Sequence, residues 1–183
     1  PFIVARRKQG VKNKTINLSL SVVRRVLNLA ARLWRDENGL TWLETAPLIQ
    51  MLPTTDARRP YPLSWDEQRT LFKALPDHLA CMCLYKVNTG CREQEVCQLR
   101  WDWEVKVPEL NTSVFLIPDE HVKNGDERLV VLNHIAKLIV DEQRGKHHEY
   151  VFTYKGKPVT TINNSGWKTA RIKCDLTQVR VHD

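Results

Sequence analysis

The first 60 residues contain one segment with the hydrophobic periodicity of a long α-helix. Between residues 15 and 35, apolar positions repeat every three or four residues and form one continuous stripe. The members of this stripe are Ile16, Leu20, Val23, Leu27, Ala30 and Trp34. A second set widens it: Val22, Val26, Leu29 and Leu33. The pattern therefore predicts a helix that packs on at least two neighbours and ends before Asn38-Gly39.

After this helix the periodicity shortens and then disappears. Apolar residues between Trp42 and Leu52 predict a brief helical piece. Residues 53–62 contain three prolines and two arginines without apolar periodicity, which is typical of an extended linker. We therefore predict two domains, a partial helical domain over residues 1–57 and a larger domain over residues 58–183.

The larger domain begins with signals for three helices. Ser64 and Glu67 have the spacing of a capping box, in which a hydroxyl and a carboxylate satisfy the first amides of a helix. Thr89-Gly90 is a helix-ending signal, and Arg92 follows it directly. The three helices are expected over residues 64–75, 77–87 and 92–101.

From Trp103 onward the pattern changes to that of strands. Asn124-Gly125 predicts a hairpin turn between two arms, since both turn residues must reach a positive φ. The predicted elements are a strand over 113–118, hairpin arms over 120–123 and 126–132, a helix over 133–144, a strand over 150–152, a turn at 156–158 and a helix over 160–174. The fold class is therefore α+β, a mostly helical domain with a small antiparallel β-sheet, preceded by a partial all-α domain.

Charge is distributed unevenly along the chain. The net charge is +7, and the first 60 residues carry eleven Lys and Arg against four Asp and Glu. Residues 61–183 carry seventeen of each. A concentrated basic segment suits a polyanion, because each neutralised phosphate releases condensed counterions. The surplus therefore favours a nucleic-acid partner, with a solvated helix face as the alternative.

Membrane insertion and secretion are not indicated. No apolar run approaches the roughly 20 residues that cross a bilayer. Residues 1–8 place a short apolar stretch before a basic cluster, the reverse of a secretion signal. We therefore expect a cytoplasmic protein. The first residue is Pro1 rather than Met, and we expect the chain to begin inside a longer gene product.

Five cysteines stand at positions 81, 83, 91, 97 and 174. Structural zinc sites usually space a cysteine pair by two to four residues on a turn. Four of these cysteines instead fall in strongly helical, apolar sequence, where a free cysteine is an ordinary core residue. A reduced core is the main interpretation, and a zinc-dependent nucleic-acid module remains an alternative.

Three short segments carry the candidate chemistry. The sequence has no Gly-rich phosphate loop, no H-E-x-x-H and no G-x-S-x-G. It does have Arg92 at the start of a predicted helix, where free amides favour an anion and a guanidinium can grip two phosphate oxygens. Glu95 lies three residues further on the same helix face. Lys123 occupies the predicted hairpin turn, and His182 lies next to the chain end.

In this order and spacing the three segments resemble the catalytic domain of tyrosine recombinases. Residues 89–95, Thr-Gly-Cys-Arg-Glu-Gln-Glu, match the T-G-x-R-x-x-E box of that family. Lys123 matches its hairpin lysine, with residues 128–132 similar to the R-x-V-P-L strand, and His182-Asp183 resembles the opening of its H-x-L-R-H box. The resemblance covers roughly residues 58–183 and, more weakly, residues 1–57, which look like the end of a helical core-binding domain.

The resemblance implies a function and roles for these residues. The family integrates or excises DNA by strand transfer through a 3′-phosphotyrosine link, with no metal or nucleotide cofactor. Arg92 and His182 would contact the scissile phosphate, Lys123 would protonate the departing 5′-oxygen, and Glu95 would orient the site. The family's second arginine and its nucleophilic tyrosine have no counterpart up to residue 183, so we expect this chain alone to be unable to cleave DNA.

Double-stranded DNA is the expected partner, with self-association on DNA in the full-length protein. Contacts to phosphates position a protein without specifying sequence. The basic residues expected to make them are Arg24, Arg25, Arg32, Arg35, Arg58, Arg59, Lys168, Arg171 and Lys173.

Two further alternatives remain open at this point. One is a non-enzymatic DNA-binding relative that retains the DNA clamp but not the chemistry. The other is a metal-dependent nuclease, whose activity would vanish with a chelator.

Overall fold

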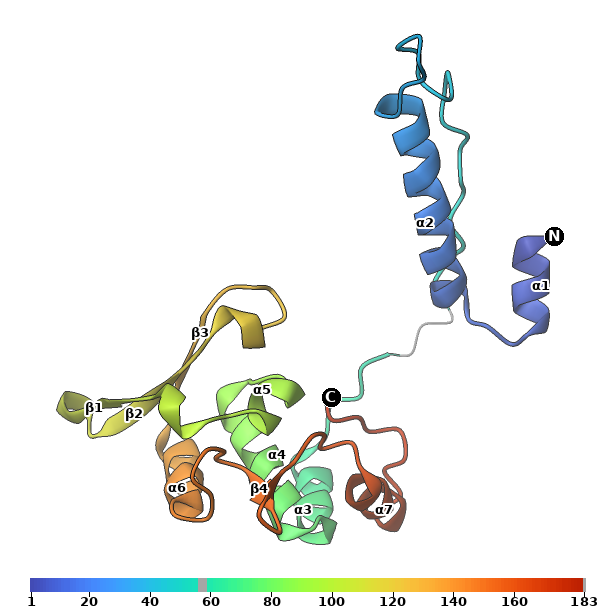
Figure 1. Ribbon diagram of the computed structural model, residues 1–183. Helices are drawn as coiled ribbons and strands as arrows, with labels where there is room; N and C mark the ends of the chain where they lie inside the picture. Colours follow the sequence, from blue (N-terminus) through green and yellow to red (C-terminus); the bar gives the residue numbers. More distant parts are fainter. Residues whose placement is uncertain (56–58, 183) are drawn as a thin grey trace. The chain divides into compact units, whose positions relative to one another are not determined.

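The structure, a computed structural model, describes residues 1–55 and 59–182 (Figure 1). The chain divides into two units, Pro1–Pro60 and Tyr61–Asp183, which are described separately below. The division falls inside the proline-rich segment 53–62. Arg58, one of the predicted DNA contacts, lies outside the described residues.

The N-terminal unit is built on one long helix. Its helices are α1 (Phe2–Lys8) and α2 (Asn13–Arg32). The predicted long helix is therefore confirmed, although it ends earlier than expected. Of its wide apolar stripe, only Ile16, Leu20 and Ala30 are buried. Much of the apolar surface of α2 is consequently exposed in the described part of the chain.

The prediction of a short helix between Trp42 and Leu52 is wrong. The segment has no helical turn and instead runs back along α2. Asn17 fixes it through its side-chain amide, which donates to the carbonyl oxygen of Leu52 at 2.8 Å and accepts from the Leu52 backbone N–H at 2.9 Å. Pro47 explains the difference, because it lacks a backbone donor and disfavours helical geometry in the residue before it.

The larger unit carries five helices within the described residues. These are α3 (Trp65–Ala74), α4 (Asp77–Thr89), α5 (Glu93–Cys97), α6 (His134–Gln143) and α7 (Ser165–Lys173). The predicted capping box is present, since the Ser64 hydroxyl accepts from the Glu67 N–H and the Glu67 carboxylate accepts from the Ser64 N–H. Asn133 and Asn164 cap α6 and α7 in the same way through their side-chain oxygens.

An antiparallel sheet lies beside these helices (Figure 1). Its strands, in the order β1-β2-β3, are β1 (Glu104–Val107), β2 (Thr112–Ile117) and β3 (Arg128–Val131). A second sheet pairs β4 (Thr153–Tyr154) with β5 (Lys157–Pro158). Short 3₁₀ turns are η1 (Trp101–Trp103), η2 (Pro108–Leu110) and η3 (Asp119–His121). The α+β class predicted from the sequence is therefore confirmed.

Three strand predictions need correction. The partner of β3 is β2 rather than residues 120–123, because Pro118 follows β2 and the chain then enters η3. Gly125 reaches a positive φ of 73° but Asn124 does not, so the Asn-Gly pair is not a two-residue hairpin turn. Residues 150–152 form a single bridge from Tyr150 to Arg100, and the strand follows them at Thr153.

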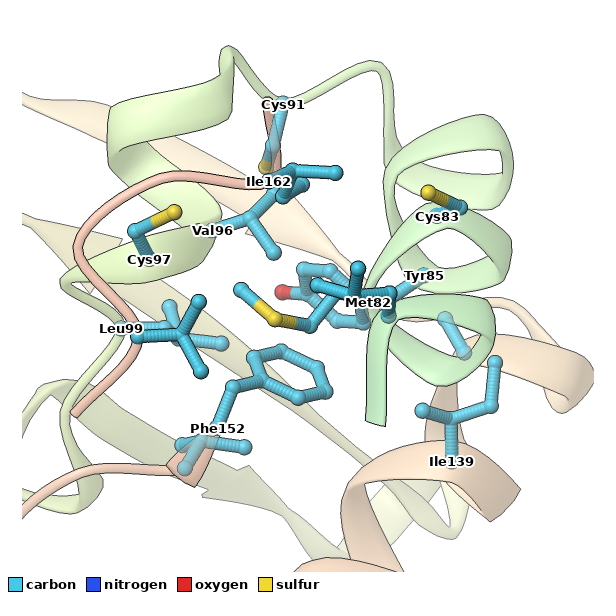
Figure 2. Close-up of a cluster of buried hydrophobic side chains, with 14 of the residues drawn as sticks. Met82, Cys83, Tyr85, Cys91, Val96, Cys97, Leu99, Ile139, Phe152 and Ile162 are labelled. Atoms are coloured by element: carbon cyan, nitrogen blue, oxygen red, sulfur yellow. The ribbon is translucent and has the colours of Figure 1, made fainter. Parts of the chain in front are cut away.

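One hydrophobic core holds the larger unit together. α4 packs on α5 and α6, and α3 packs on α7. Figure 2 shows Met82 and Tyr85 of α4 among Val96, Leu99 and Phe152, all of them buried. This core fixes where α5 begins, and α5 carries the candidate site.

All five cysteines are free, and three of them belong to this core. Burial raises the pKa of the Cys83 and Cys97 thiols to about 12, which disfavours the thiolate that a zinc ion requires. Within residues 1–55 and 59–182, no group of three or more His, Cys, Asp or Glu side chains could hold a metal ion. No helix in the same ranges has the length and apolar character needed to cross a bilayer.

An ion pair ties the sheet to α6. The carboxylate of Glu104 on β1 accepts two hydrogen bonds from the Arg144 guanidinium, at 2.9 and 2.6 Å. These bonds lower the pKa of the Glu104 carboxyl. Arg144 also lies over the ring of Trp101, 5.0 Å from its centre. The outer strand β1 is thereby fixed against the helical part of the unit.

Candidate active site

A pocket of about 680 Å³ lies where α5, η3 and the end of the chain meet. It is lined by Arg92, Glu93, Gln94, Glu95, Gln98, Glu120, His121, Val122, Lys123 and His182. The four residues singled out from the sequence as catalytic, Arg92, Glu95, Lys123 and His182, therefore share one pocket although they are spread over half of the chain.

The turn between α4 and α5 places Arg92 at this pocket. Gly90 ends α4 with a left-handed φ of 65°, a conformation that glycine adopts without steric cost. Cys91 then turns into the core, and Arg92 becomes the N-cap residue of α5 with a side chain 41% exposed. α5 ends at Cys97, earlier than predicted, so its dipole adds little to anion binding.

Glu95 is buried beneath Arg92, with only 2% of its side chain exposed. Its carboxylate accepts a hydrogen bond from the Arg92 backbone N–H at 2.8 Å and lies 3.1 Å from the Arg92 guanidinium. A second guanidinium, that of Arg128 on β3, lies 3.1 Å from the other carboxylate oxygen. Two cationic partners offset the desolvation of this carboxylate. Glu95 thus contacts both the backbone and the side chain of Arg92 from the buried side of the site.

Arg128 is a residue that the sequence interpretation assigned only to a strand. Besides the Glu95 pair, its guanidinium donates to the Gly90 carbonyl oxygen at 3.0 Å. The one signal in the sequence was its position five residues after Lys123, at the start of the strand that the resemblance also covers. Arg128 therefore joins β3 to both sides of the turn that carries Arg92.

Glu93 is a second residue whose contacts the sequence did not reveal. Its carboxylate accepts from the Thr161 hydroxyl at 2.6 Å and from the backbone N–H groups of Ile162 and Asn163 at 2.8 and 3.1 Å. Burial raises the pKa of this carboxyl, but these bonds outweigh burial and hold the pKa below its ordinary value. The other carboxylate oxygen lies 3.9 Å from His182 Nε2. Glu93 thereby connects α5 to two later segments.

Lys123 lies on the turn between η3 and β3 with its side chain exposed. Among the described residues, its ammonium group has no ion pair or hydrogen bond. The neighbouring η3 is anchored by His121, whose Nδ1 is 3.1 Å from the Gln98 side-chain oxygen and whose ring lies 4.8 Å from that of Trp103. The turn is thus held on one side by the residue that follows α5 and leaves the lysine available to a ligand.

None of the four tyrosines of the chain lines this pocket. Tyr85 is fully buried in the core, and Tyr61 donates to Glu67 at 2.6 Å. Tyr150 accepts from Arg100, and Tyr154 stacks on His78 with ring centres 4.1 Å apart.

The predicted DNA contacts fall into several groups. Arg24, Arg25 and Arg32 line one hollow of about 620 Å³ along α2. Arg35 donates to the Gly39 carbonyl oxygen at 3.4 Å. Arg59, Lys168 and Lys173 are exposed. Arg171 differs, because its guanidinium donates to the carbonyl oxygens of Thr177 and Val179 and so holds the C-terminal segment.

Comparison with known proteins agrees with this arrangement. The chain belongs to the phage integrase family of tyrosine recombinases, whose sequence profile matches residues 63–183. It is similar to the integrase of Salmonella phage P22, with 26% identity over 177 residues. That match covers 90% of this chain but 43% of the relative, so the chain spans less than half the length of the curated relative it matches.

Solved recombinase structures have the same fold. The chain is similar to the XerH site-specific recombinase bound to a palindromic difH substrate in a post-cleavage complex. The TM-score is 0.63 at 15% identity, with 94% of this chain and 52% of that chain covered. The pre-cleavage complex of XerH with difH gives a TM-score of 0.61 at 14% identity, covering 99% and 54%. At such low identities the likeness establishes the fold alone.

Proposed function

We propose that this chain is part of an enzyme that cuts and rejoins DNA at specific sites through a 3′-phosphotyrosine intermediate. The observation that carries the proposal is the pocket that brings Arg92, Lys123 and His182 together over a buried Glu95. Membership of the phage integrase family and similarity to recombinases described as bound to DNA substrates support it.

Each residue has a distinct task in the proposed reaction. The oxygen of a deprotonated tyrosine forms a bond to phosphorus while the bond from phosphorus to the 5′-oxygen breaks. Arg92 grips two phosphate oxygens and stabilises the charge that develops on them in the transition state. Lys123 donates its proton to the departing 5′-oxygen, and His182 contacts the same phosphate. Glu95 orients Arg92 and does not touch DNA.

The proposed substrate is double-stranded DNA, and no metal or nucleotide takes part. Arg24, Arg25 and Arg32 on α2 contact phosphates and position the duplex. Several copies of the full-length protein assemble on DNA, since strand exchange joins ends held by different protomers. We place the activity in the cytoplasm.

We further propose that the attacking tyrosine lies in a part of the protein outside these 183 residues. The residues up to 183 alone then bind duplex DNA but form no covalent adduct. The test is to incubate this chain, and a longer gene product that continues past residue 183, with labelled duplex DNA containing the target site. Adducts that survive denaturing detergent are then counted on a gel.

We expect adducts from the longer product and none from this chain. Arg92→Ala in the longer product should reduce adduct formation at least about 100-fold, the usual cost of removing a preorganised charge stabiliser. An adduct from this chain alone would contradict the incompleteness proposal. Tight, salt-sensitive duplex binding without an adduct from the longer product would instead identify a non-enzymatic DNA-binding relative.

A further inference from the structure

The charges that line the pocket do not by themselves favour an anion. Arg92 and Lys123 contribute two positive charges, and Glu93, Glu95 and Glu120 contribute three negative ones. Counting the two histidines of the lining, His121 and His182, as neutral, the lining therefore has a formal charge of −1. A phosphodiester is itself an anion, so a site of this composition needs a further positive charge close by.

Arg128 supplies that charge from behind the pocket. It is not part of the lining, yet its guanidinium lies 3.1 Å from the buried Glu95 carboxylate. Glu95 is the acid of the site that is most enclosed, at 2% exposure, so its charge is the least screened by water. A cation placed on Glu95 therefore changes the field in the pocket more than one placed on the exposed Glu120.

The geometry also separates two tasks of the Glu95 carboxylate. One oxygen faces the Arg92 guanidinium, whereas the other accepts from the Arg92 backbone N–H and faces Arg128. Without Arg128, Arg92 would be the only guanidinium paired with this carboxylate, and the two charges would cancel. With Arg128 present, two guanidiniums share one carboxylate and a net positive charge remains for a ligand.

We infer that Arg128 is a positioning residue that neutralises Glu95 and so leaves the Arg92 guanidinium free to bind a DNA phosphate. The inference rests on the proposed function, because it assumes that Arg92 binds a phosphate. Arg128 acts through Glu95 and Arg92 and does not itself touch the DNA. It also opens β3, five residues after Lys123, and anchors that strand to the Gly90 carbonyl oxygen at 3.0 Å.

The test measures phosphate binding at Arg92 directly in the 183-residue chain. Inorganic phosphate is titrated at constant ionic strength and pH 7.5, and the Nε–H signal of the Arg92 side chain is followed by nitrogen-15 NMR. We expect the wild-type signal to move with phosphate. Arg128→Met should weaken the apparent affinity at least about fivefold, as expected for one partly screened charge. Arg128→Lys keeps the charge and should remain within about twofold of wild type.

A double variant separates positioning from direct contact. If Arg128 acts by neutralising Glu95, then E95Q/R128M removes both charges and should recover most of the wild-type affinity. If the double variant binds as weakly as Arg128→Met, Arg128 touches the anion itself and the inference is overturned. Arg69→Met is the matched control, because Arg69 pairs with Asp66 on α3 and its loss changes the net charge equally.

The outcomes distinguish this inference from the proposed function. A wild-type Arg92 signal that ignores phosphate would contradict both. Binding by wild type that Arg128→Met leaves unchanged would overturn the role of Arg128 alone. The backbone amide signals of the core report whether each variant is folded. If Arg128→Met does not fold, the phosphate affinity of Arg128→Lys relative to wild type provides the decisive comparison.

Discussion

The two units use charge and apolar surface in opposite ways. The N-terminal unit buries three apolar side chains of α2, leaves much of its apolar stripe exposed and carries the whole charge surplus of the chain. The larger unit has a continuous core and equal numbers of acidic and basic residues, several of them in ion pairs. Its Glu95 pairs with two arginines, whereas Arg24 and Arg25 face an open hollow.

This contrast teaches how the two proposed tasks, catalysis and DNA binding, would be divided. A site that stabilises a transition state needs side chains held to a fraction of an ångström, which requires a packed core and satisfied charges. A surface that attracts a polyanion needs only unpaired positive charge. The larger unit has the first set of properties and the N-terminal unit has the second. Each of the following predictions tests that division.

The largest effect should come from the same substitution made in each unit. Leu79 of α4 is fully buried, whereas Leu18 of α2 is 63% exposed. Leu79→Ala should lower the free energy of unfolding by about 2–5 kcal/mol through lost burial and a cavity. Leu18→Ala should change it by about 0.5 kcal/mol or less. Urea denaturation followed by circular dichroism measures both, and equal losses would contradict the contrast in packing.

The next effect concerns the salt dependence of duplex DNA binding. Each phosphate contact contributes about 0.9 to the slope of log affinity against log salt concentration. The triple variant R24A/R25A/R32A should therefore reduce that slope by roughly 2–3. Arg69→Ala, which removes an arginine already paired with Asp66 in the larger unit, should leave it almost unchanged. Fluorescence anisotropy at several salt concentrations gives the slopes, and identical slopes for all three proteins would show that α2 does not contact DNA.

The smallest effect should be a pH-dependent loss of stability on changing Glu93. Bonds from Thr161 and the following amides hold the pKa of Glu93 below the ordinary 4.5. A carboxyl with a lowered pKa contributes stability that is complete above its unfolded pKa and disappears as pH falls through its folded value. Glu93→Gln should thus cost about 1.5–3 kcal/mol at pH 7, the value of a hydrogen bond to a charged group. The difference from wild type should shrink steadily below pH 4.5.

Glu44→Gln in the N-terminal unit is the matched control for this measurement. Glu44 is exposed, and the substitution should change the free energy of unfolding by about 0.5 kcal/mol or less at every pH. Urea denaturation of both variants and wild type between pH 3 and pH 7 provides the comparison. A Glu93→Gln loss that stayed constant down to pH 3 would mean that the carboxylate charge contributes nothing.

Local sequence patterns predicted the elements whose causes are themselves local. The apolar stripe gave α2, the Ser64–Glu67 box gave the start of α3, and Gly90 gave the end of α4. The helix predicted before the linker does not form, because Pro47 interrupts it. The strand β1 was not predicted from the sequence. Strand pairing depends on partners that are distant in the chain, so a turn signal such as Asn124-Gly125 could suggest a hairpin without identifying its first arm.

The same limit applies to the candidate site. The resemblance to tyrosine recombinases selected Arg92, Glu95, Lys123 and His182, and they line one pocket, while their catalytic roles stay predictions. The partners that hold them were not found. Thr161 lies 68 residues after Glu93, and the Gly90 carbonyl that Arg128 contacts lies 38 residues before it. No periodicity or capping rule connects residues at such separations.

The two ion pairs at the edges of the three-stranded sheet have a consequence for folding. β2 has apolar residues on both faces, with Val114 and Leu116 on one and Phe115 and Ile117 on the other. A slip by one residue would therefore replace one apolar face with another, and hydrophobic pattern alone would select weakly against it. A shift of β1 or β3 by one residue would instead turn Glu104 away from Arg144 or Arg128 away from Glu95, so these bonds fix the alignment of the outer strands. The central strand β2 therefore pairs with two neighbours whose positions are already fixed by contacts outside the sheet.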